Sequence, residues 1–258
     1  MTVAAVDGLE ITQVDRAQLI RFCRPDKKNA LKSDMYTAMR EALITGDVNP
    51  DISAHVFIGS DGVFTAGNDI GEFAARADGN AGLSDHVQSF IRHLPMVEKP
   101  MIAAVDGLAV GIGTTLLFHC DLVYASPTAS FRTPFLNLGL VPEAGSSLIA
   151  PWTMGHARAF ELLVLGEPFD AERAREAGIV NHVVAAEALQ ETALTAVARL
   201  AEKPPEALAL SRRLLRSQTS AIRQRIDEEI AIFADRLQSP EAREAFAAFF
   251  EKRPPRFR

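Results

Sequence analysis

The stretch KPMIAAVDGLAVGIG, residues 99–113, holds the elements that decide the fold of this chain. Its apolar run, Met101 to Val105, has the length of a buried strand and ends in an Asp-Gly turn. A loop with glycines at 111 and 113 follows, and the apolar residues from Gly111 to His119 predict a helix. The stretch therefore predicts a strand, a glycine-bearing loop and a helix in succession.

The same order of elements precedes this stretch, whereas the chain after Pro142 is mainly helical. Upstream, Ala54 to Gly59 predicts a strand that leads into the loop Ser60 to Asp69. Stacked strand–loop–helix units indicate an α/β fold. We expect residues 1–200 to form this core and residues 201–258 to form a helical C-terminal region, with a hinge near Ala201. Helices are predicted downstream at Ser146–Thr153, Ala157–Leu165, Asp170–Ala177, Glu187–Ala201, Pro204–Ser217, Ile222–Leu237 and Pro240–Lys252, with a short strand at Ile179–Val184.

Composition limits the classes of function. The 258 residues carry a formal net charge of -6, which argues against nucleic-acid binding driven by counterion release. No apolar segment reaches the roughly 18 residues that a membrane helix needs, so no membrane association is expected. Two widely separated cysteines and an N-terminus without a signal-peptide pattern favour a cytoplasmic protein. The six histidines lack metal-ligand spacing, so no metal is expected.

Two glycine-bearing loops are candidates for binding an anion. FTAGND, residues 64–69, ends in a turn that can direct backbone N–H groups outward, and DGLAVGIGTT, residues 106–115, lets a ligand approach the backbone at its glycines. An ordinary helix cap at Asn68 or Asp69, and close packing of helix on strand, remain the alternatives. The second loop is not a dinucleotide fingerprint, because Leu116 stands where the third glycine is needed.

One carboxylate stands out in FRTPFLNLGLVPEAGSS, residues 131–147. Glu143 lies in a turn punctuated by proline and glycine, and it is either a first-turn helix carboxylate or a catalytic base. The neighbouring serines do not suggest a hydrolase, because Leu148 replaces the second glycine of a GxSxG elbow.

Two basic patches are either solvated surface or contacts for a phosphate-rich ligand. Arg24, Lys27 and Lys28 form the first, and Lys252 with Arg253 forms the second beside two phenylalanines.

Taken together, these segments resemble the crotonase, or enoyl-CoA hydratase/isomerase, superfamily over nearly the whole chain. The resemblance implies a crotonase-like spiral of ββα units, a helical C-terminal trimerisation region, and a homotrimer or dimer of trimers. It also implies coenzyme A thioesters as substrates, with no permanently bound cofactor. The matching segments, in order, are RPDKKNAL at 24–31, FTAGNDI at 64–70, KPMIAAVDGLAVGIG at 99–113, CDLVYAS at 120–126, GLVPEAGSS at 139–147 and FFEKRPPRF at 249–257.

The resemblance also assigns roles to individual residues. The backbone N–H groups of Asn68 and Ile112 would bind the thioester oxygen in an oxyanion hole, each donor contributing about 3 kcal/mol. Ala66 would lie beside the adenine. The residues implied in coenzyme A binding are Arg24, Lys27, Ala66, Asp69, Phe249 and Lys252, the last two from a neighbouring subunit.

The chain departs from the family at the two glutamates that a hydratase uses to activate and deliver water. Thr115 and Phe135 stand at those positions, and neither can transfer a proton. Glu143 matches the acid/base of the peroxisomal-type isomerases, where one carboxylate moves a proton from C2 to C4. The sequence therefore favours an acyl-CoA double-bond isomerase of fatty-acid or related acyl-CoA degradation. A hydratase and a non-catalytic acyl-CoA-binding assembly subunit remain the alternatives, and the segment 71–85 is expected to influence acyl-chain length.

Overall fold

The structure, a computed structural model, describes residues 2–73 and 83–257. Residues 74–82, which belong to the segment expected to influence chain length, lie outside the described residues. The main sheet of the described chain has seven strands in the order β1-β2-β3-β4-β5-β7-β10. From β3 onward the neighbouring strands run parallel, while β1, β2 and β3 form an antiparallel meander. The strands are β1 Thr2–Val6, β2 Leu9–Val14, β3 Ala17–Phe22, β4 Ala54–Ile58, β5 Met101–Val105, β7 Leu122–Ala125 and β10 His182–Val183.

The central strands are buried on both faces, as expected for parallel strands covered by helices. Every residue of β4 and β5 is buried. Because side chains alternate along a strand, Val56 packs in one apolar cluster with residues of α8 (Leu189–Ala201). Phe57, the next residue, packs in the other cluster, which includes residues of α1 (Ser33–Val48) and α3 (Asp85–His93). The predicted strand at 101–105 is confirmed.

A second, smaller sheet consists of β6 (Leu108–Val110), β8 (Ser130–Arg132) and β9 (Phe169–Asp170). The chain passes from β5 of the main sheet to β6 of this one and then into α4 (Ile112–Thr115). An isolated parallel bridge between Thr65 and Ala109 brings the loop after β4 alongside β6. The chain passes from the main sheet to the smaller one between β5 and β6 and again between β7 and β8. The succession β5, β6, α4 is a ββα unit of the kind that the resemblance implies.

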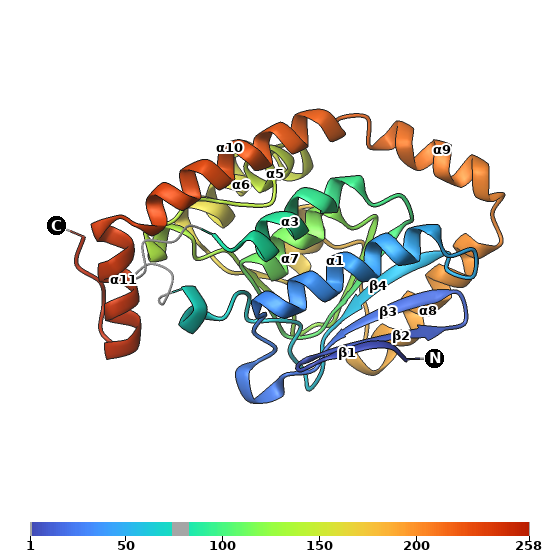
Figure 1. Ribbon diagram of the computed structural model, residues 1–258, viewed down its shortest axis with the longest axis horizontal. Helices are drawn as coiled ribbons and strands as arrows, with labels where there is room; N and C mark the ends of the chain where they lie inside the picture. The colour runs from blue at the N-terminus through green and yellow to red at the C-terminus, as the bar shows by residue number, and fades with distance from the viewer. Residues whose placement is uncertain (1, 74–82, 258) are drawn as a thin grey trace.

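Helices dominate after residue 142. Long α10 runs along one side of the molecule, with α9 at one end and α11 at the other (Figure 1). In contrast to the single predicted helices, residues 111–119 divide into α4 and a 3-10 turn, and the helix expected at 157–165 ends in a π-helical turn. The remaining elements are η1 Pro25–Lys27, η2 Leu94–Met96, η3 Leu116–His119, η4 Leu136–Leu138, α5 Ser146–Met154, α6 His156–Phe160, η5 Glu161–Leu165, α7 Ala171–Glu176, η6 Ala186–Ala188, α9 Pro205–Leu215, α10 Thr219–Leu237 and α11 Pro240–Glu251.

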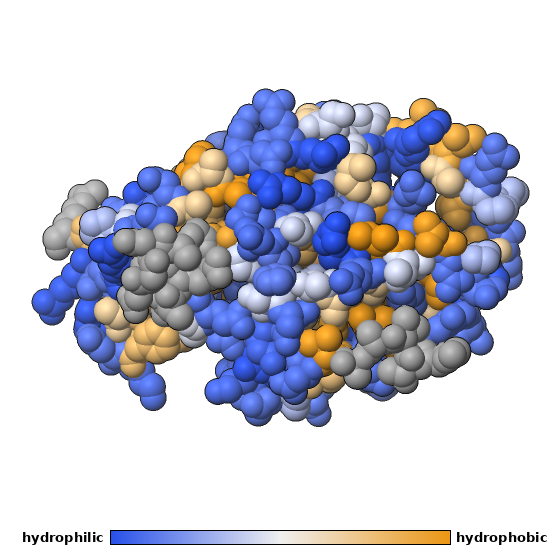
Figure 2. Space-filling model, viewed as in Figure 1, coloured by the Kyte–Doolittle hydropathy of each residue, from blue (hydrophilic) through white to orange (hydrophobic). Residues whose placement is uncertain are grey.

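Exposed apolar side chains collect on α9. Leu214 and Leu215 are 76% and 87% exposed. In the space-filling view, orange hydrophobic residues interrupt the mostly hydrophilic surface in the region of α9 (Figure 2). Large exposed apolar side chains close together on one helix are typical of a contact surface. Within the described parts of the chain, no helix is both long and apolar enough to span a bilayer.

Candidate active site

The two glycine-bearing loops lie against each other. Thr65 N–H donates to Leu108 O at 2.9 Å, and Val110 N–H donates to Thr65 O at 3.0 Å. A Cβ on Gly113 would lie 2.5 Å from Thr65 Cγ2, and one on Gly67 would lie 2.5 Å from Val110 O. Both distances are shorter than real Cβ contacts allow. The glycines are therefore required for the close approach of the loops.

The approach leaves two N–H groups without partners. Leu31 N–H donates to Gly67 O and Asp69 N–H donates to Leu31 O, so the backbone bonds pass on either side of Asn68. Among the backbone and side-chain hydrogen bonds of the described residues, no bond uses the N–H of Asn68 or Ile112 as a donor. Ile112 opens α4, where an N–H has no partner within the helix. Two such donors in adjacent loops can stabilise an oxyanion.

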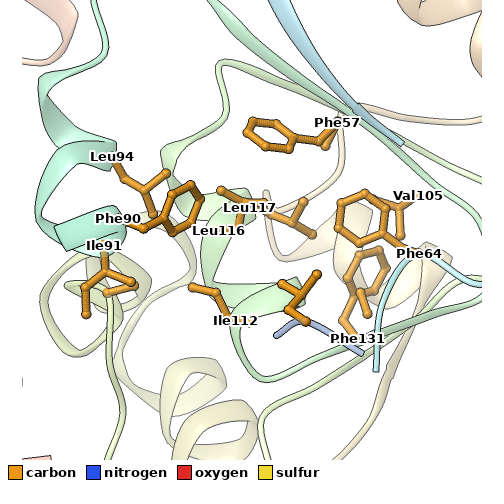
Figure 3. Close-up of a cluster of buried hydrophobic side chains, with 14 of the residues drawn as sticks. Phe57, Phe64, Phe90, Ile91, Leu94, Val105, Ile112, Leu116, Leu117 and Phe131 are labelled. Atoms are coloured by element: carbon orange, nitrogen blue, oxygen red, sulfur yellow. The ribbon is translucent and has the colours of Figure 1, made fainter. Parts of the chain in front are cut away.

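The side chain of Ile112 does not compete with this role. It belongs to the same buried apolar cluster as Leu116 and Phe131, and the residue is 1% exposed (Figure 3). Gly111, immediately before it, has φ 57° and ψ -119°, a conformation that residues with a side chain rarely adopt. This glycine turns the chain from β6 into α4.

Glu143 is buried and is not a helix cap. It is 3% exposed, and α5 starts at Ser146 with Gly145 as its N-cap. The helix-cap interpretation of Glu143 is therefore wrong. Its Oε1 accepts a hydrogen bond from Thr115 Oγ1 at 2.5 Å. Its Oε2 is buried and has no hydrogen-bond partner among the described residues. A buried carboxyl oxygen without a partner can exchange a proton with a substrate.

Burial raises the pKa of Glu143 to about 8. Desolvation of the carboxylate is the main cause, and the negative charge of Glu229 raises it further, while the hydrogen bond from Thr115 opposes both. A pKa near neutrality suits a group that must both accept and return a proton.

Tyr36 connects α1 to the loop that carries Asn68. Its buried hydroxyl donates to Asn68 Oδ1 at 2.6 Å, and its ring packs edge-on against Phe90. Burial raises the pKa of the Tyr36 phenol well above its usual value, and the nearby charge of Glu143 raises it further. The phenol therefore stays protonated and remains a hydrogen-bond donor to Asn68.

Comparison with known proteins identifies the family to which this chain belongs. The family model for enoyl-CoA hydratase/isomerase matches residues 15–258. The chain belongs to this enoyl-CoA hydratase/isomerase family. A probable enoyl-CoA hydratase echA8 of Mycobacterium leprae is 33% identical over 97% of this chain and 98% of its own. Enoyl-CoA delta isomerase 2 of Rattus norvegicus is 34% identical over 96% of this chain, which spans 64% of that protein's length.

Solved structures agree with this assignment. Pseudomonas aeruginosa OdaA superposes with a TM-score of 0.90 at 42% identity, covering 95% of this chain and 99% of its own. An enoyl-CoA hydratase/isomerase from Pseudoalteromonas atlantica T6c gives 0.91 at 36% identity, with coverage of 97% and 100%. The predicted crotonase fold is thus confirmed, and the chain is an enzyme of this family.

Two positions set this chain apart from a two-glutamate hydratase of the family. Thr115 is fully buried, and its hydroxyl is committed to Glu143. Phe135 is 6% exposed and packs in the apolar core. The position of one expected glutamate therefore carries a hydrogen-bond donor to Glu143, and the other carries a core aromatic ring.

The residues suggested for coenzyme A binding form two separate groups. Arg24 Nη1 pairs with Asp69 Oδ2 at 2.8 Å, and Ala66 N–H donates to Lys28 O, while Lys27 is exposed nearby in η1. Phe249 near the end of α11 and Lys252, its C-cap residue, are exposed, and among the described residues no hydrogen bond, ion pair or ring contact joins them to the first group. The structure brings together Arg24, Lys27, Ala66 and Asp69 but does not bring Phe249 and Lys252 to them.

Three site neighbours carry no motif in the sequence. They are Tyr36, His119 and Glu229, which contact Asn68, Ala144 and the turn 145–147 respectively. Tyr36 and His119 are separated from their partners by 32 and 25 residues, and Glu229 is 84 residues from Gly145. A buried polar residue on an otherwise apolar helix face was the available signal.

Two surface cavities do not include the residues of the candidate site. Two cavities of about 420 Å³ flank Arg212, and neither is lined by Asn68, Ile112 or Glu143. Across residues 2–73 and 83–257, no group of three or more His, Cys, Asp or Glu side chains is arranged to hold a metal ion.

Proposed function

We propose that this protein is an acyl-CoA double-bond isomerase that converts 3-enoyl-CoA to 2-enoyl-CoA. The observation that carries the proposal is the Glu143 carboxyl, which is buried with one oxygen free while Thr115 and Phe135 stand at the hydratase positions. With one carboxyl group available, proton transfer between two carbons is the reaction that this site supports best.

In the proposed mechanism, the thioester oxygen accepts hydrogen bonds from the N–H groups of Asn68 and Ile112. The Glu143 carboxylate removes a proton from C2, and the electrons move onto the thioester oxygen to give a dienolate. The two N–H donors stabilise that negative charge, which is where backbone dipoles have the largest effect. Glu143, now protonated, returns the proton at C4, and the double bond ends between C2 and C3.

The apolar surroundings of Glu143 support this use. The neighbouring residues Leu140 and Ala144 are buried, so bulk water is displaced from the carboxyl group. Water addition requires a positioned water and a second proton donor. Because Thr115 and Phe135 stand where a hydratase has glutamates, Glu143 has no second carboxyl group at those positions to direct that water.

Hydration remains the second candidate, because relatives of similar identity include proteins named as probable hydratases. Purified enzyme should be given 3-enoyl-CoA and 2-enoyl-CoA separately, with products separated by chromatography and mass spectrometry. We expect fast isomerisation of the first, slow hydration of the second, and loss of isomerisation by about 10³-fold in Glu143→Gln.

Glu143→Gln keeps the size of the side chain, so its thermal unfolding serves as the folding control. Rapid formation of 3-hydroxyacyl-CoA by the wild type would favour hydration. Tight binding of the thioesters without turnover of either would favour a non-catalytic acyl-CoA-binding subunit.

We further propose a cytoplasmic homotrimer or dimer of trimers that acts in fatty-acid or related acyl-CoA degradation. The exposed Leu214 and Leu215 support self-association, because leaving them in water is unfavourable. In such an assembly, Phe249 and Lys252 would reach the coenzyme A site of a neighbouring subunit. Light scattering after size-exclusion chromatography measures the assembly, and a monomer at micromolar concentration would contradict it.

A further inference from the structure

The turn that carries Glu143 is closed by hydrogen bonds from the Ser146 N–H and Oγ to Glu143 O, but its backbone includes an unfavourable conformation. Ala144 and Gly145 have φ angles of 59° and 74°, two successive left-handed residues. This conformation is unfavourable for alanine, whose Cβ crowds the backbone. The following helix, α5, begins without a capping side chain of its own, because its N-cap residue is Gly145.

Glu229 of α10 supplies the missing cap. Its Oε2 accepts from Gly145 N–H at 2.6 Å, and its Oε1 accepts from Ser147 N–H at 3.0 Å and from Ser147 Oγ at 2.5 Å. Both oxygens are used, and the residue is 4% exposed. A carboxylate from a distant helix therefore takes the place of an N-cap and fixes the two residues on either side of Ser146.

The same turn is held from the opposite side by η3. His119 Nε2 lies 2.7 Å from Ala144 O, to which it donates, and burial lowers the pKa of His119 to about 3, so the ring is neutral. Thr115 of α4 binds the Glu143 side chain itself. Among the contacts that His119, Thr115 and Glu229 make with the turn, only that of Glu229 involves an ionisable carboxyl group.

The contact of α10 with the turn is close. A Cβ added to Gly145 would lie 3.0 Å from Ile222 Cγ2 and 3.3 Å from Ile226 Cγ1. The apolar face of α10 thus presses on the residue whose N–H Glu229 binds. Any displacement of α10 would move Gly145, and with it the peptide chain two residues from Glu143.

The charged and titratable groups around this turn are few. Glu229 lies on α10 with Arg225, whose Nη1 donates to Ser147 Oγ at 3.2 Å. Tyr36 of α1 and His119 of η3 stay neutral, as described above. Burial raises the pKa of Glu229, while its hydrogen bonds from Ser147 and Gly145 and the charge of Arg225 lower it. In its ionised form, Glu229 opposes ionisation of the Glu143 carboxyl.

We propose that Glu229 is a positioning residue for the reaction: it holds the turn 143–147 in its left-handed form and keeps Glu143 in its proton-accepting place. Proton transfer then depends on the docking of α10. This inference rests on the proposed function for its kinetic readout but not for its structural one.

Glu229→Gln tests the proposal, because the amide keeps the size and one acceptor but loses the charge. We expect kcat for isomerisation to fall about tenfold with KM nearly unchanged, because the oxyanion loops do not contact Glu229. The midpoint of the pH profile of kcat/KM should move below about 8, since the repulsion that disfavours the Glu143 carboxylate is removed. Asp235→Asn, an exposed carboxylate on α10, is the matched control and should change neither.

An infrared titration separates this inference from the isomerase proposal. The wild-type spectrum should contain a carboxylic-acid band that is missing from the spectrum of Glu143→Gln. That band reports the protonation of Glu143 and needs no turnover. A lower midpoint for that band in Glu229→Gln supports the inference even if no isomerisation occurs. An unchanged midpoint together with unchanged kcat would overturn it.

Ser147→Ala is the milder variant if Glu229→Gln does not fold. It removes one of the three bonds to Glu229 and leaves both N–H contacts. We expect about a threefold loss of kcat at constant KM, and full activity in a folded Ser147→Ala protein would overturn the proposal.

Discussion

The oxyanion loops and the turn that carries Glu143 are held by different interactions. In the loops, backbone bonds between Thr65 and the strand at 108–110 fix the N–H donors, and glycines allow the approach. In the turn, His119 of η3 and Glu229 of α10 bind a backbone that includes the unfavourable left-handed Ala144, and Thr115 of α4 binds the Glu143 side chain. The proposed charge-stabilising half of the site is thus part of the sheet architecture, whereas the proposed proton-transferring half depends on tertiary contacts.

This difference predicts which substitutions the glycine-bearing loops and the Glu143 turn each tolerate. A backbone donor survives most side-chain substitutions at its own position, which is why Ile112 can stand at an oxyanion position. Displacement of the loop, however, would move the N–H donor out of position. The carboxyl group, in contrast, responds to the chemistry of every neighbour, because its pKa depends on them.

Among substitutions that leave Glu143 itself in place, the largest expected effect comes from forcing the loops apart. In Gly113→Ala, the new Cβ would meet Thr65 Cγ2 at 2.5 Å, so one loop must shift. We expect kcat/KM for isomerisation to fall about 10²-fold, because small misplacements of catalytic groups have effects of this size. Steady-state kinetics on 3-enoyl-CoA measures it.

Thr65→Ser provides the rescue control for this prediction. It removes Cγ2 but keeps the hydroxyl that donates to Asn29 O and accepts from Gly67 N–H. The double variant should recover most of the lost activity. Full activity in Gly113→Ala alone would show that the spacing of the loops does not matter.

The next effect comes from the hydrogen bond between Thr115 and Glu143. Thr115→Val keeps the shape but removes the donor, and because that bond lowers the pKa of Glu143, its loss should raise the midpoint above about 8. The carboxylate is the proton-accepting form, so kcat/KM at pH 7 should fall about tenfold, in line with a hydrogen bond to a charged group.

The pH profile of kcat/KM between pH 6 and 10 checks this prediction. Thr115→Ser should stay close to wild type. A midpoint that moves down in Thr115→Val would contradict the assigned role of the hydroxyl.

A smaller effect is expected at the link between Tyr36 and Asn68. Tyr36→Phe removes a hydrogen bond of 2.6 Å but keeps the ring packed on Phe90. A net loss of about 1 kcal/mol corresponds to about a fivefold decrease in kcat. Tyr124→Phe, which changes the other tyrosine of the chain, is the control, and equal losses in both variants would remove the special role of Tyr36.

The smallest effect concerns the coenzyme A tail. If Lys252 contacts a phosphate, Lys252→Ala should weaken the binding of a CoA ester about threefold at low salt and less at high salt. Calorimetric titration measures the affinity, and Lys203→Ala, another exposed lysine, should have no effect. Unchanged affinity in Lys252→Ala would remove this residue from the binding site.

The sequence locates the two glycine-bearing loops well, for a physical reason. Glycines at 67, 111 and 113 mark positions where backbone approaches backbone, and the strands before them are short apolar runs, so both loops can be located from local patterns. The C-terminal helices were also predictable, because their apolar residues recur with helical spacing and prolines mark their starts.

The support of Glu143 was not predictable in the same way. Local sequence left a helix cap and a catalytic base as equal alternatives. The sequence predicts a helix starting at Ser146, but only the fold shows that Glu229 binds the N–H groups at its start. A contact between residues 84 positions apart leaves no spacing pattern to recognise. The coenzyme A residues on α11 stay a prediction, because one chain does not bring them to Arg24.

The fate of the proton tests most directly whether Glu143 alone moves the double bond. The wild type and Glu143→Gln should be given 3-enoyl-CoA carrying deuterium at C2 in ordinary water, and early product should be examined by mass spectrometry. We predict 2-enoyl-CoA with part of the deuterium at C4 from the wild type, because a carboxyl that is 3% exposed returns the proton before complete exchange with solvent. Product without deuterium at C4, or equal product from Glu143→Gln, would contradict the account.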